Sequence, residues 1–160
     1  MNTRILALFS GLMLLAACET AGTNDGSAGG SGSGYGSGSG YGSDGGELAP
    51  NVGDRVFFGY DSSVLSSEAQ STLQRQANWL QSNPSINVVV EGHADERGTR
   101  AYNLALGERR ASAARTYLVN LGVNPSRVST VSYGKERPAE LGSNESAWAK
   151  NRRAVTVISY

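Results

Sequence analysis

Charged side chains gather in two short segments that together could bind a small zwitterion. Residues 91–98 (Glu-Gly-His-Ala-Asp-Glu-Arg-Gly) follow a β-branched run, and a second cluster occupies residues 108–110 (Glu-Arg-Arg). If the chain folds back between them, Asp95 and Arg110 face one cleft. The carboxylate would then take an ammonium, and the guanidinium would take a carboxylate in a two-pronged contact. The alternative is that the two side chains simply pair with each other across the loop.

Other candidate sites for chemistry are weaker. His93 has no second His or Cys at a metal-ligand spacing, which favours a structural hydrogen bond over metal ligation. Ser132 and Lys135 match the Ser-x-x-Lys of penicillin-binding enzymes, but there is no Lys-Thr-Gly companion and the serine falls in a predicted strand. We therefore expect no catalytic serine and no metal, and nothing in the sequence indicates a cofactor.

Two more charged groups have simple interpretations. Glu91, Asp95 and Glu96 could supply the carboxylate pair of a glycosidase, but a small head leaves little room for a polysaccharide cleft. The basic run at residues 150–153 (Lys-Asn-Arg-Arg) is typical of a solvated edge, with partner contact as the minority interpretation. Trp79 and Trp148 are expected to pack against the sheet or its edge.

The hydrophobic pattern predicts which elements position these groups. A capping box of Ser67 and Gln70 opens a first helix, and Pro84 ends it. Residues 86–90 (Ile-Asn-Val-Val-Val) are mostly β-branched, the pattern of a strand buried on both faces. A second helix spans about residues 101–121 and stops at Gly122. The predicted apolar stripes of the two helices are Ala69, Leu73, Ala77 and Leu80, and Ala111, Ala114, Leu118 and Leu121.

The remaining elements complete one sheet. Strands are predicted at residues 55–60, 128–133 and 154–158, with a turn capped by Asn124-Pro125 and a short helix over residues 145–150. The order β-α-β-α-β-(α)-β predicts an α/β sandwich (α+β), a mixed sheet with two main helices on one face. Loops at the carboxyl ends of strands usually bind ligands, which places residues 92–100 at the expected site.

The first seventeen residues read as a secretory signal peptide. Arg4 precedes an apolar run over residues 5–17. As a helix this run spans about 20 Å, short of the roughly 30 Å hydrocarbon core of a membrane. The pattern of a basic residue, a short apolar stretch and small residues is typical of a cleaved leader, with an N-terminal core helix as the alternative. Cys18 is the only cysteine, so the fold has no internal disulfide.

Residues 18–47 are expected to form a flexible tether. Residues 19–47 contain 12 glycines and no Leu, Ile or Val, and a six-residue repeat places Tyr35 and Tyr41 in equivalent positions. Such a coil has a typical end-to-end distance of roughly 30 Å and a ceiling of roughly 100 Å. The folded head is therefore residues 48–160, whose net charge of +3 is too small to indicate a nucleic-acid partner.

Residues 15–18 (Leu-Ala-Ala-Cys) resemble the lipobox of bacterial lipoproteins, in which cleavage falls before the cysteine. The resemblance implies a diacylglyceryl group on the sulfur of Cys18 and another acyl chain on its new amino terminus. Two or more chains anchor a protein stably. Glu19 follows instead of the Asp that often signals retention at the inner membrane, which favours the outer membrane.

The head resembles OmpA-like peptidoglycan-binding domains. The resemblance is carried in order by Phe58-Gly59-Tyr60-Asp61, by residues 90–98, by Tyr102-Asn103-x-x-Leu106-Gly107-Glu108-Arg109-Arg110-Ala111, by residues 131–135 and by residues 151–155. It implies non-covalent binding of the diaminopimelate in the stem peptide of peptidoglycan, gripped by Asp95 and Arg110. The other positions implied to line the groove are Asp61, Phe58, Gly59, Asn103 and Leu106. Many members have a serine at the position of Gly107 and a valine at that of Ala114, but Gly107 suits the lipoprotein branch.

The resemblance also implies partners and a cellular role. These are the periplasmic protein TolB and the inner-membrane protein TolA, acting in outer-membrane integrity and in constriction during division. We expect binding without turnover by a head in the periplasm. A small periplasmic cell-wall hydrolase on the same scaffold, or a pure protein-interaction module, are the alternatives.

Overall fold

The computed structural model describes Leu48 and residues 50–160, which lie in the predicted head. The predicted signal peptide, Cys18 and the whole of the predicted tether lie outside the described residues. Within that part of the chain, no helix has both the length and the apolar character needed to cross a membrane. The elements are β1 (Arg55–Phe57), α1 (Ser67–Ser82), β2 (Asn87–His93), α2 (Arg100–Asn120), the 3-10 turn η1 (Pro125–Arg127), β3 (Val128–Gly134), α3 (Glu145–Asn151) and β4 (Arg153–Ser159).

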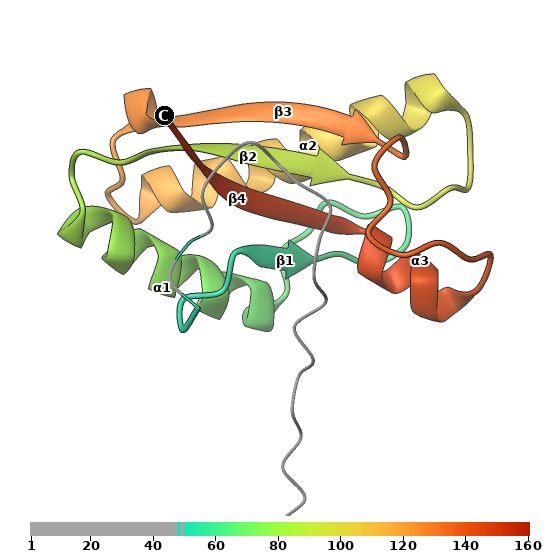
Figure 1. Cartoon of the computed structure of the whole chain (residues 1–160), viewed down its shortest axis with the longest axis horizontal. Helices are drawn as coiled ribbons and strands as arrows, with labels where there is room; N and C mark the ends of the chain where they lie inside the picture. The colour runs from blue at the N-terminus through green and yellow to red at the C-terminus, as the bar shows by residue number, and fades with distance from the viewer. Residues whose placement is uncertain (1–47, 49) are drawn as a thin grey trace, which may run out of the picture. The chain divides into compact units, whose positions relative to one another are not determined.

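The four strands form one mixed sheet in the order β1-β4-β2-β3 (Figure 1). β2 pairs with β3 in parallel, and β4 is antiparallel to both β1 and β2. This confirms the predicted α+β fold. Because β1, β2 and β3 therefore run in one direction, their carboxyl ends meet at one edge of the sheet, where β4 begins and α3 lies (Figure 1).

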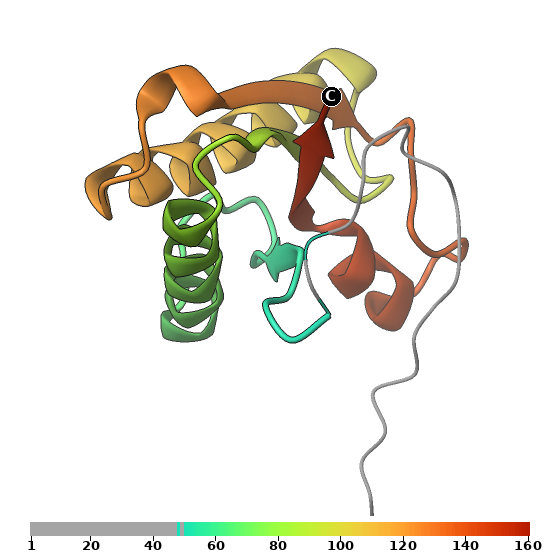
Figure 2. The ribbon, with the colours of Figure 1, turned by 60° about the vertical axis from the view of Figure 1, so that its left-hand side comes forward.

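Helices α1 and α2 cover the same face of the sheet (Figure 2). The predicted apolar stripes are confirmed, except that Leu121 is only partly buried. Between the helices and the strands lies a single cluster of buried apolar side chains. Its members are Val56, Phe58, Ala69, Leu73, Ala77, Leu80, Val88, Val90, Ala111, Ala114, Leu118, Val123, Val128 and Ala154.

Strand β2 is less enclosed than its sequence indicates. Val88 and Val90 are buried against the helices, whereas Val89 on the other face is half-buried and Asn87 is exposed. Over residues 86–90 the predicted burial on both faces is therefore wrong, because both long helices pack on one side; only at Glu91 and His93, further along β2, is the other face buried as well. The strand also runs on through Gly92 to His93, so the loop before α2 is residues 94–99, which we call the binding loop.

The helices begin and end close to the capping residues that the sequence predicts, except that the N-cap of α1 lies one residue earlier. Ser66, not Ser67, caps α1: its backbone is extended and its Oγ accepts from the amide of Ala69 at 3.2 Å. Gln70 therefore does not close a capping box, and its side chain instead donates to the Leu65 carbonyl. Helix α1 stops before Pro84, as predicted. Gly122 ends α2 in the left-handed region at φ 97°, and Asn124 caps η1.

Two glycines let α2 lie directly on the sheet. A Cβ at Gly92 would overlap the carbonyl of Gly107, and a Cβ at Gly107 would lie 2.8 Å from the carbonyl oxygen of Gly92. A side chain at either position would force helix and strand apart. This contact therefore positions Arg110, one turn further along α2, above the end of β2.

Candidate functional site

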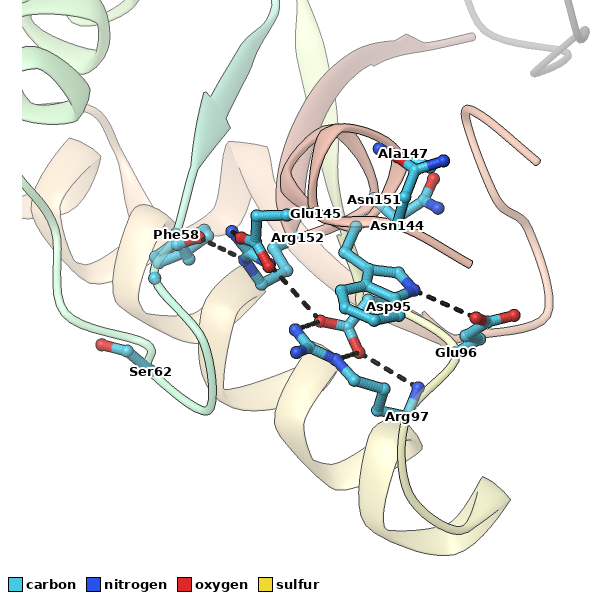
Figure 3. A network of polar contacts seen from close by, with 12 residues as sticks. Phe58, Ser62, Asp95, Glu96, Arg97, Asn144, Glu145, Ala147, Asn151 and Arg152 are labelled. Atoms are coloured by element: carbon cyan, nitrogen blue, oxygen red, sulfur yellow. Dashed lines mark hydrogen bonds and ion pairs between the residues drawn. The ribbon is translucent and has the colours of Figure 1, made fainter. Parts of the chain in front are cut away.

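Asp95, in the binding loop, lies where β2 leaves the sheet. The loop is tied to β3 by a hydrogen bond from the Ala94 amide to the Gly134 carbonyl, 2.8 Å long. The Asp95 side chain is almost fully buried, and its described partners are cations and an amide (Figure 3). Burial raises the pKa of Asp95, but hydrogen bonds from Arg97 and the charges of Arg97 and Arg152 hold that pKa below its usual value of 3.8.

Arg97 is the closest partner of Asp95. Its Nε donates to Oδ1 at 3.1 Å and its Nη2 donates to Oδ2 at 2.6 Å. The guanidinium also lies over two ring faces, with Cζ 4.2 Å from the ring centroid of Tyr60 and 4.0 Å from that of Trp148. The indole N–H of Trp148 donates to Glu96, 3.0 Å away (Figure 3). Trp148 therefore packs against the binding loop at the edge of the sheet, and Trp79 packs against the core, as predicted.

Arg110 is fully buried and does not pair with Asp95. Its three nitrogens donate to backbone carbonyls of Ser62 (2.8 Å), His93 (2.8 Å) and Gly59 (3.0 Å). Burial lowers the pKa of Arg110 to about 10, the charge of Asp95 acts against this, and the group stays cationic at neutral pH. The alternative of a simple pair across the loop is therefore wrong. The two groups are close enough to interact electrostatically, but Arg110 is bound to the backbone of the β1–α1 turn and of β2.

The basic run before β4 is buried, which corrects the prediction of a solvated edge. Lys150 is exposed and pairs with Glu140, but Asn151, Arg152 and Arg153 are buried. The strand order explains the difference, because the start of β4 lies between β1 and β2, at the edge where the carboxyl ends of both strands meet.

Arg152 is a site residue that the sequence did not indicate. Its Nε donates to the Phe58 carbonyl at 3.0 Å, and its Nη2 donates to Glu145 at 2.6 Å (Figure 3). Its Nη1 lies 3.6 Å from Asp95 Oδ2 and, although buried, has no hydrogen-bond partner. A basic residue beside a short helix carries no local signal for such a role; only the pairing of β4 with its neighbours brings it there.

The turn between β1 and α1 forms another side of the site. Strand β1 ends at Phe57, earlier than predicted, because the carbonyls of the next two residues accept hydrogen bonds from side chains. The Phe58 carbonyl accepts from Arg152, and the Gly59 carbonyl accepts from Arg110. The Phe58 side chain is buried. Asp61 has a left-handed backbone at φ 48°, and its exposed carboxylate accepts a hydrogen bond from the Tyr102 hydroxyl.

Helix α2 contributes the remaining predicted residues. Asn103 is buried, and its side chain donates to the Arg97 carbonyl at 2.9 Å, which fixes the backbone of the binding loop. Leu106 is buried one turn before Arg110. The structure thus gathers the positions named from the sequence, and adds Arg97, Trp148 and Arg152. The seven named positions are Asp95, Arg110, Asp61, Phe58, Gly59, Asn103 and Leu106.

The three weaker candidates from the sequence, His93, Ser132 and Lys135, have contacts outside the Asp95–Arg110 site or support its loop. His93 is buried, and its ring faces the carboxylate of Glu91, which agrees with the structural role predicted for it. Its Nε2 lies 3.6 Å from Glu91 Oε2, on the face of the sheet away from the helices. Ser132 donates to the Leu104 carbonyl, whereas Lys135 donates to two carbonyls of the binding loop. Across the described part of the chain, no three His, Cys, Asp or Glu side chains group as metal ligands.

Comparison with known proteins gives a consistent set of matches. The profile of the OmpA family matches residues 57–152. A peptidoglycan-associated lipoprotein of Mesorhizobium japonicum is 58% identical over 113 residues, covering 71% of this chain and 67% of that protein. One from Pasteurella multocida is 42% identical over 156 residues, covering 96% and 95%. The crystal structure of the peptidoglycan-associated lipoprotein from Burkholderia pseudomallei superposes with a TM-score of 0.67 at 43% identity, covering 69% of this chain and 94% of that chain.

Proposed function

Because this chain belongs to the OmpA family and to its peptidoglycan-associated lipoproteins, we propose that it ties the outer membrane to the cell wall by binding peptidoglycan without covalent chemistry. The ligand is the diaminopimelate of the stem peptide, whose far end carries an ammonium and a carboxylate. Residues 1–17 are the signal peptide, Cys18 carries the acyl chains, and residues 18–47 form the tether to the periplasmic head.

The observation that carries the proposal is a buried carboxylate surrounded by cations at the sheet edge. Asp95 is 5% exposed, and the guanidinium groups of Arg97, Arg110 and Arg152 lie around it. An ionised carboxylate at such a depth is stable only with positive partners. Such a carboxylate can bind the ammonium of a ligand where that ammonium replaces one of the cations, because burial strengthens the interaction between the charges.

The ligand carboxylate has cationic partners in the same site. Arg152 Nη1 is buried without a hydrogen-bond partner and supplies an unused donor. Arg110 supplies positive charge, while its bonds to three carbonyls hold the β1–α1 turn against the end of β2. A ligand with ammonium and carboxylate on one carbon atom therefore meets complementary charges on both groups.

The wider role follows from family membership. We propose that the head works in a Tol-Pal system, with TolB and TolA as partners, in outer-membrane integrity and in constriction during division. The match to the Pasteurella multocida relative over 96% of this chain supports a common plan that includes the N-terminal segments.

The test is co-sedimentation of the full chain, in detergent, with purified sacculi. We expect binding that free diaminopimelate competes away, with no release of soluble fragments. Asp95→Asn should weaken binding by about 2–5 kcal/mol, since it leaves buried cations without their counter-charge. Glu108→Gln, at an exposed position of α2, is the matched control and should bind as the unaltered chain does.

The same assay separates the alternatives. Release of soluble fragments from the sacculi would indicate a hydrolase. Capture of protein partners without any affinity for sacculi would indicate a pure interaction module. If Asp95→Asn bound as tightly as the control, the assignment of the site would be wrong.

A further inference from the structure

The site already contains a cation of its own. Arg97 binds Asp95 through two side-chain nitrogens, and its backbone amide adds a third hydrogen bond of 3.1 Å. The Arg97 side chain is 30% exposed and that of Asp95 is 6% exposed. Arg97 therefore lies on the solvent side of the carboxylate, and a ligand ammonium cannot make a close contact with Asp95 until the guanidinium moves.

The two rings that contact Arg97 can also bind other cations. Tyr60 and Trp148 present their ring faces to the guanidinium at 4.2 and 4.0 Å. Ring faces attract any positive group, including an alkylammonium. Trp148 is held by its hydrogen bond to Glu96, whereas Tyr60 is 66% exposed and can adjust. If the Arg97 side chain moves away, the ring faces become available to an incoming ammonium.

Only the side chain of Arg97 needs to move. Its carbonyl accepts from the buried Asn103 side chain, and Lys135 holds the neighbouring carbonyls of Glu96 and Gly98 at 3.1 and 2.7 Å. The backbone of the binding loop is thus fixed on both sides of Arg97. A long, partly exposed side chain can change rotamer without disturbing that frame.

We infer that Arg97 is an internal competitor for the ammonium of the ligand: it occupies the Asp95 site in the free chain and is displaced when peptidoglycan binds. The inference rests on the proposed function. Displacement costs the ligand part of its binding free energy, so a simple amine gains too little to remove Arg97. A ligand whose carboxylate also engages Arg152 gains more, which makes Arg97 a determinant of specificity for zwitterions.

The test compares the affinities of three variants for one soluble ligand. The ligand is a muropeptide whose stem ends in diaminopimelate, titrated calorimetrically into the full chain in detergent. If the uncovered state is about a tenth of the free population, Arg97→Ala should lower Kd about tenfold. Arg97→Lys keeps the charge but loses the two-pronged contact, so its gain should be smaller. Arg100→Ala removes an exposed arginine paired with Glu136 near the same loop and controls for charge alone.

A spectroscopic readout follows the displacement itself. In a Trp79→Phe background, Trp148 is the only indole, and its emission should change when the ligand removes Arg97 from its face. The same titration of Arg97→Ala should give a different, smaller change. Thermal melts of each variant establish that the head is folded.

The outcomes are distinct. Tighter binding by Arg97→Ala, with Arg100→Ala near the parent, supports the inference. Equal or weaker binding by Arg97→Ala, while the parent chain binds, overturns it and leaves the proposed function intact, because Arg97 would then be a bystander or a direct contact. If neither the parent nor any variant bound the muropeptide or sacculi, the proposed function would fail and the inference with it.

Discussion

Arg110→Met tests whether the buried arginine holds the site together. Methionine keeps much of the aliphatic volume but removes the donors to the carbonyls of Gly59, Ser62 and His93. A hydrogen bond from a charged donor contributes about 1.5–3 kcal/mol, and a buried carbonyl left without a donor costs about 1–3 kcal/mol. Of the three bonds, only the one to His93 is fully buried, since the other two acceptors lie nearer the surface.

The loss is partly offset, because methionine also avoids the cost of burying a charge. Burial lowers the pKa of Arg110 to about 10, which indicates how much the charged form is disfavoured in the fold. We therefore expect a net loss of about 2–4 kcal/mol in the free energy of unfolding, and a melting temperature lower by about 10–20 °C. Weaker wall binding by this variant would then reflect distortion of the β1–α1 turn as well as a lost charge.

The assay is urea unfolding followed by far-ultraviolet circular dichroism, with the midpoint and slope compared between variants. Arg109→Met is the matched control: its side chain is exposed on the same helix and its nearest ring, Tyr102, has its centroid 5.7 Å from Cζ. The control should lie within about 0.5 kcal/mol of the parent. If Arg110→Met and Arg109→Met unfolded at the same urea concentration, the three hydrogen bonds would contribute no net stability and the reasoning would be refuted.

Three other predictions concern pH, packing and the binding loop. Burial lowers the pKa of His93, the only histidine, below 6.5, so the unfolded chain binds a proton at this residue at a higher pH than the folded chain does. The free energy of unfolding should therefore fall from pH 7 to pH 5. In urea titrations at each pH, His93→Gln should make that decline shallower. Gly107→Ser should lower the free energy of unfolding by about 1–3 kcal/mol, because its Cβ would crowd the Gly92 carbonyl. Ala105→Ser, at an exposed position of the same helix, should lower it by less than about 1 kcal/mol, and thermal melts compare the two variants. Lys135→Met removes two hydrogen bonds to carbonyls of the binding loop and should weaken co-sedimentation with sacculi about fivefold; unchanged binding would show that the loop keeps its shape without them.

The local sequence determined the elements of this fold well. The spacing of Leu73 and Leu80 marks the buried face of α1, and Gly122 marks the end of α2, as the structure confirms. These signals are local: side chains three or four residues apart share a helix face whatever the rest of the chain does. Even the error at Ser66 and Ser67 was only one residue, because neighbouring serines offer the same capping oxygen.

The candidate positions of the site could also be named from the sequence, because Asp95 and Arg110 lie in motifs that resemble those of the family. What the motifs left open was which groups they contact. Asp95 binds Arg97 and Arg152, and Arg110 binds three carbonyls, although the sequence suggested either a shared ligand or a direct pair. The sequence also predicted a solvated edge where Arg152 is buried.

Those contacts were decided by the tertiary structure alone. The strand order β1-β4-β2-β3 places the start of β4 between the ends of β1 and β2, which brings Arg152 to both Phe58 and Asp95. The close contact of Gly92 with Gly107 then sets how deeply Arg110 lies beneath the β1–α1 turn. Hydrophobic periodicity says which face of an element is buried, but the pairing of strands distant in sequence decides which charges are buried together.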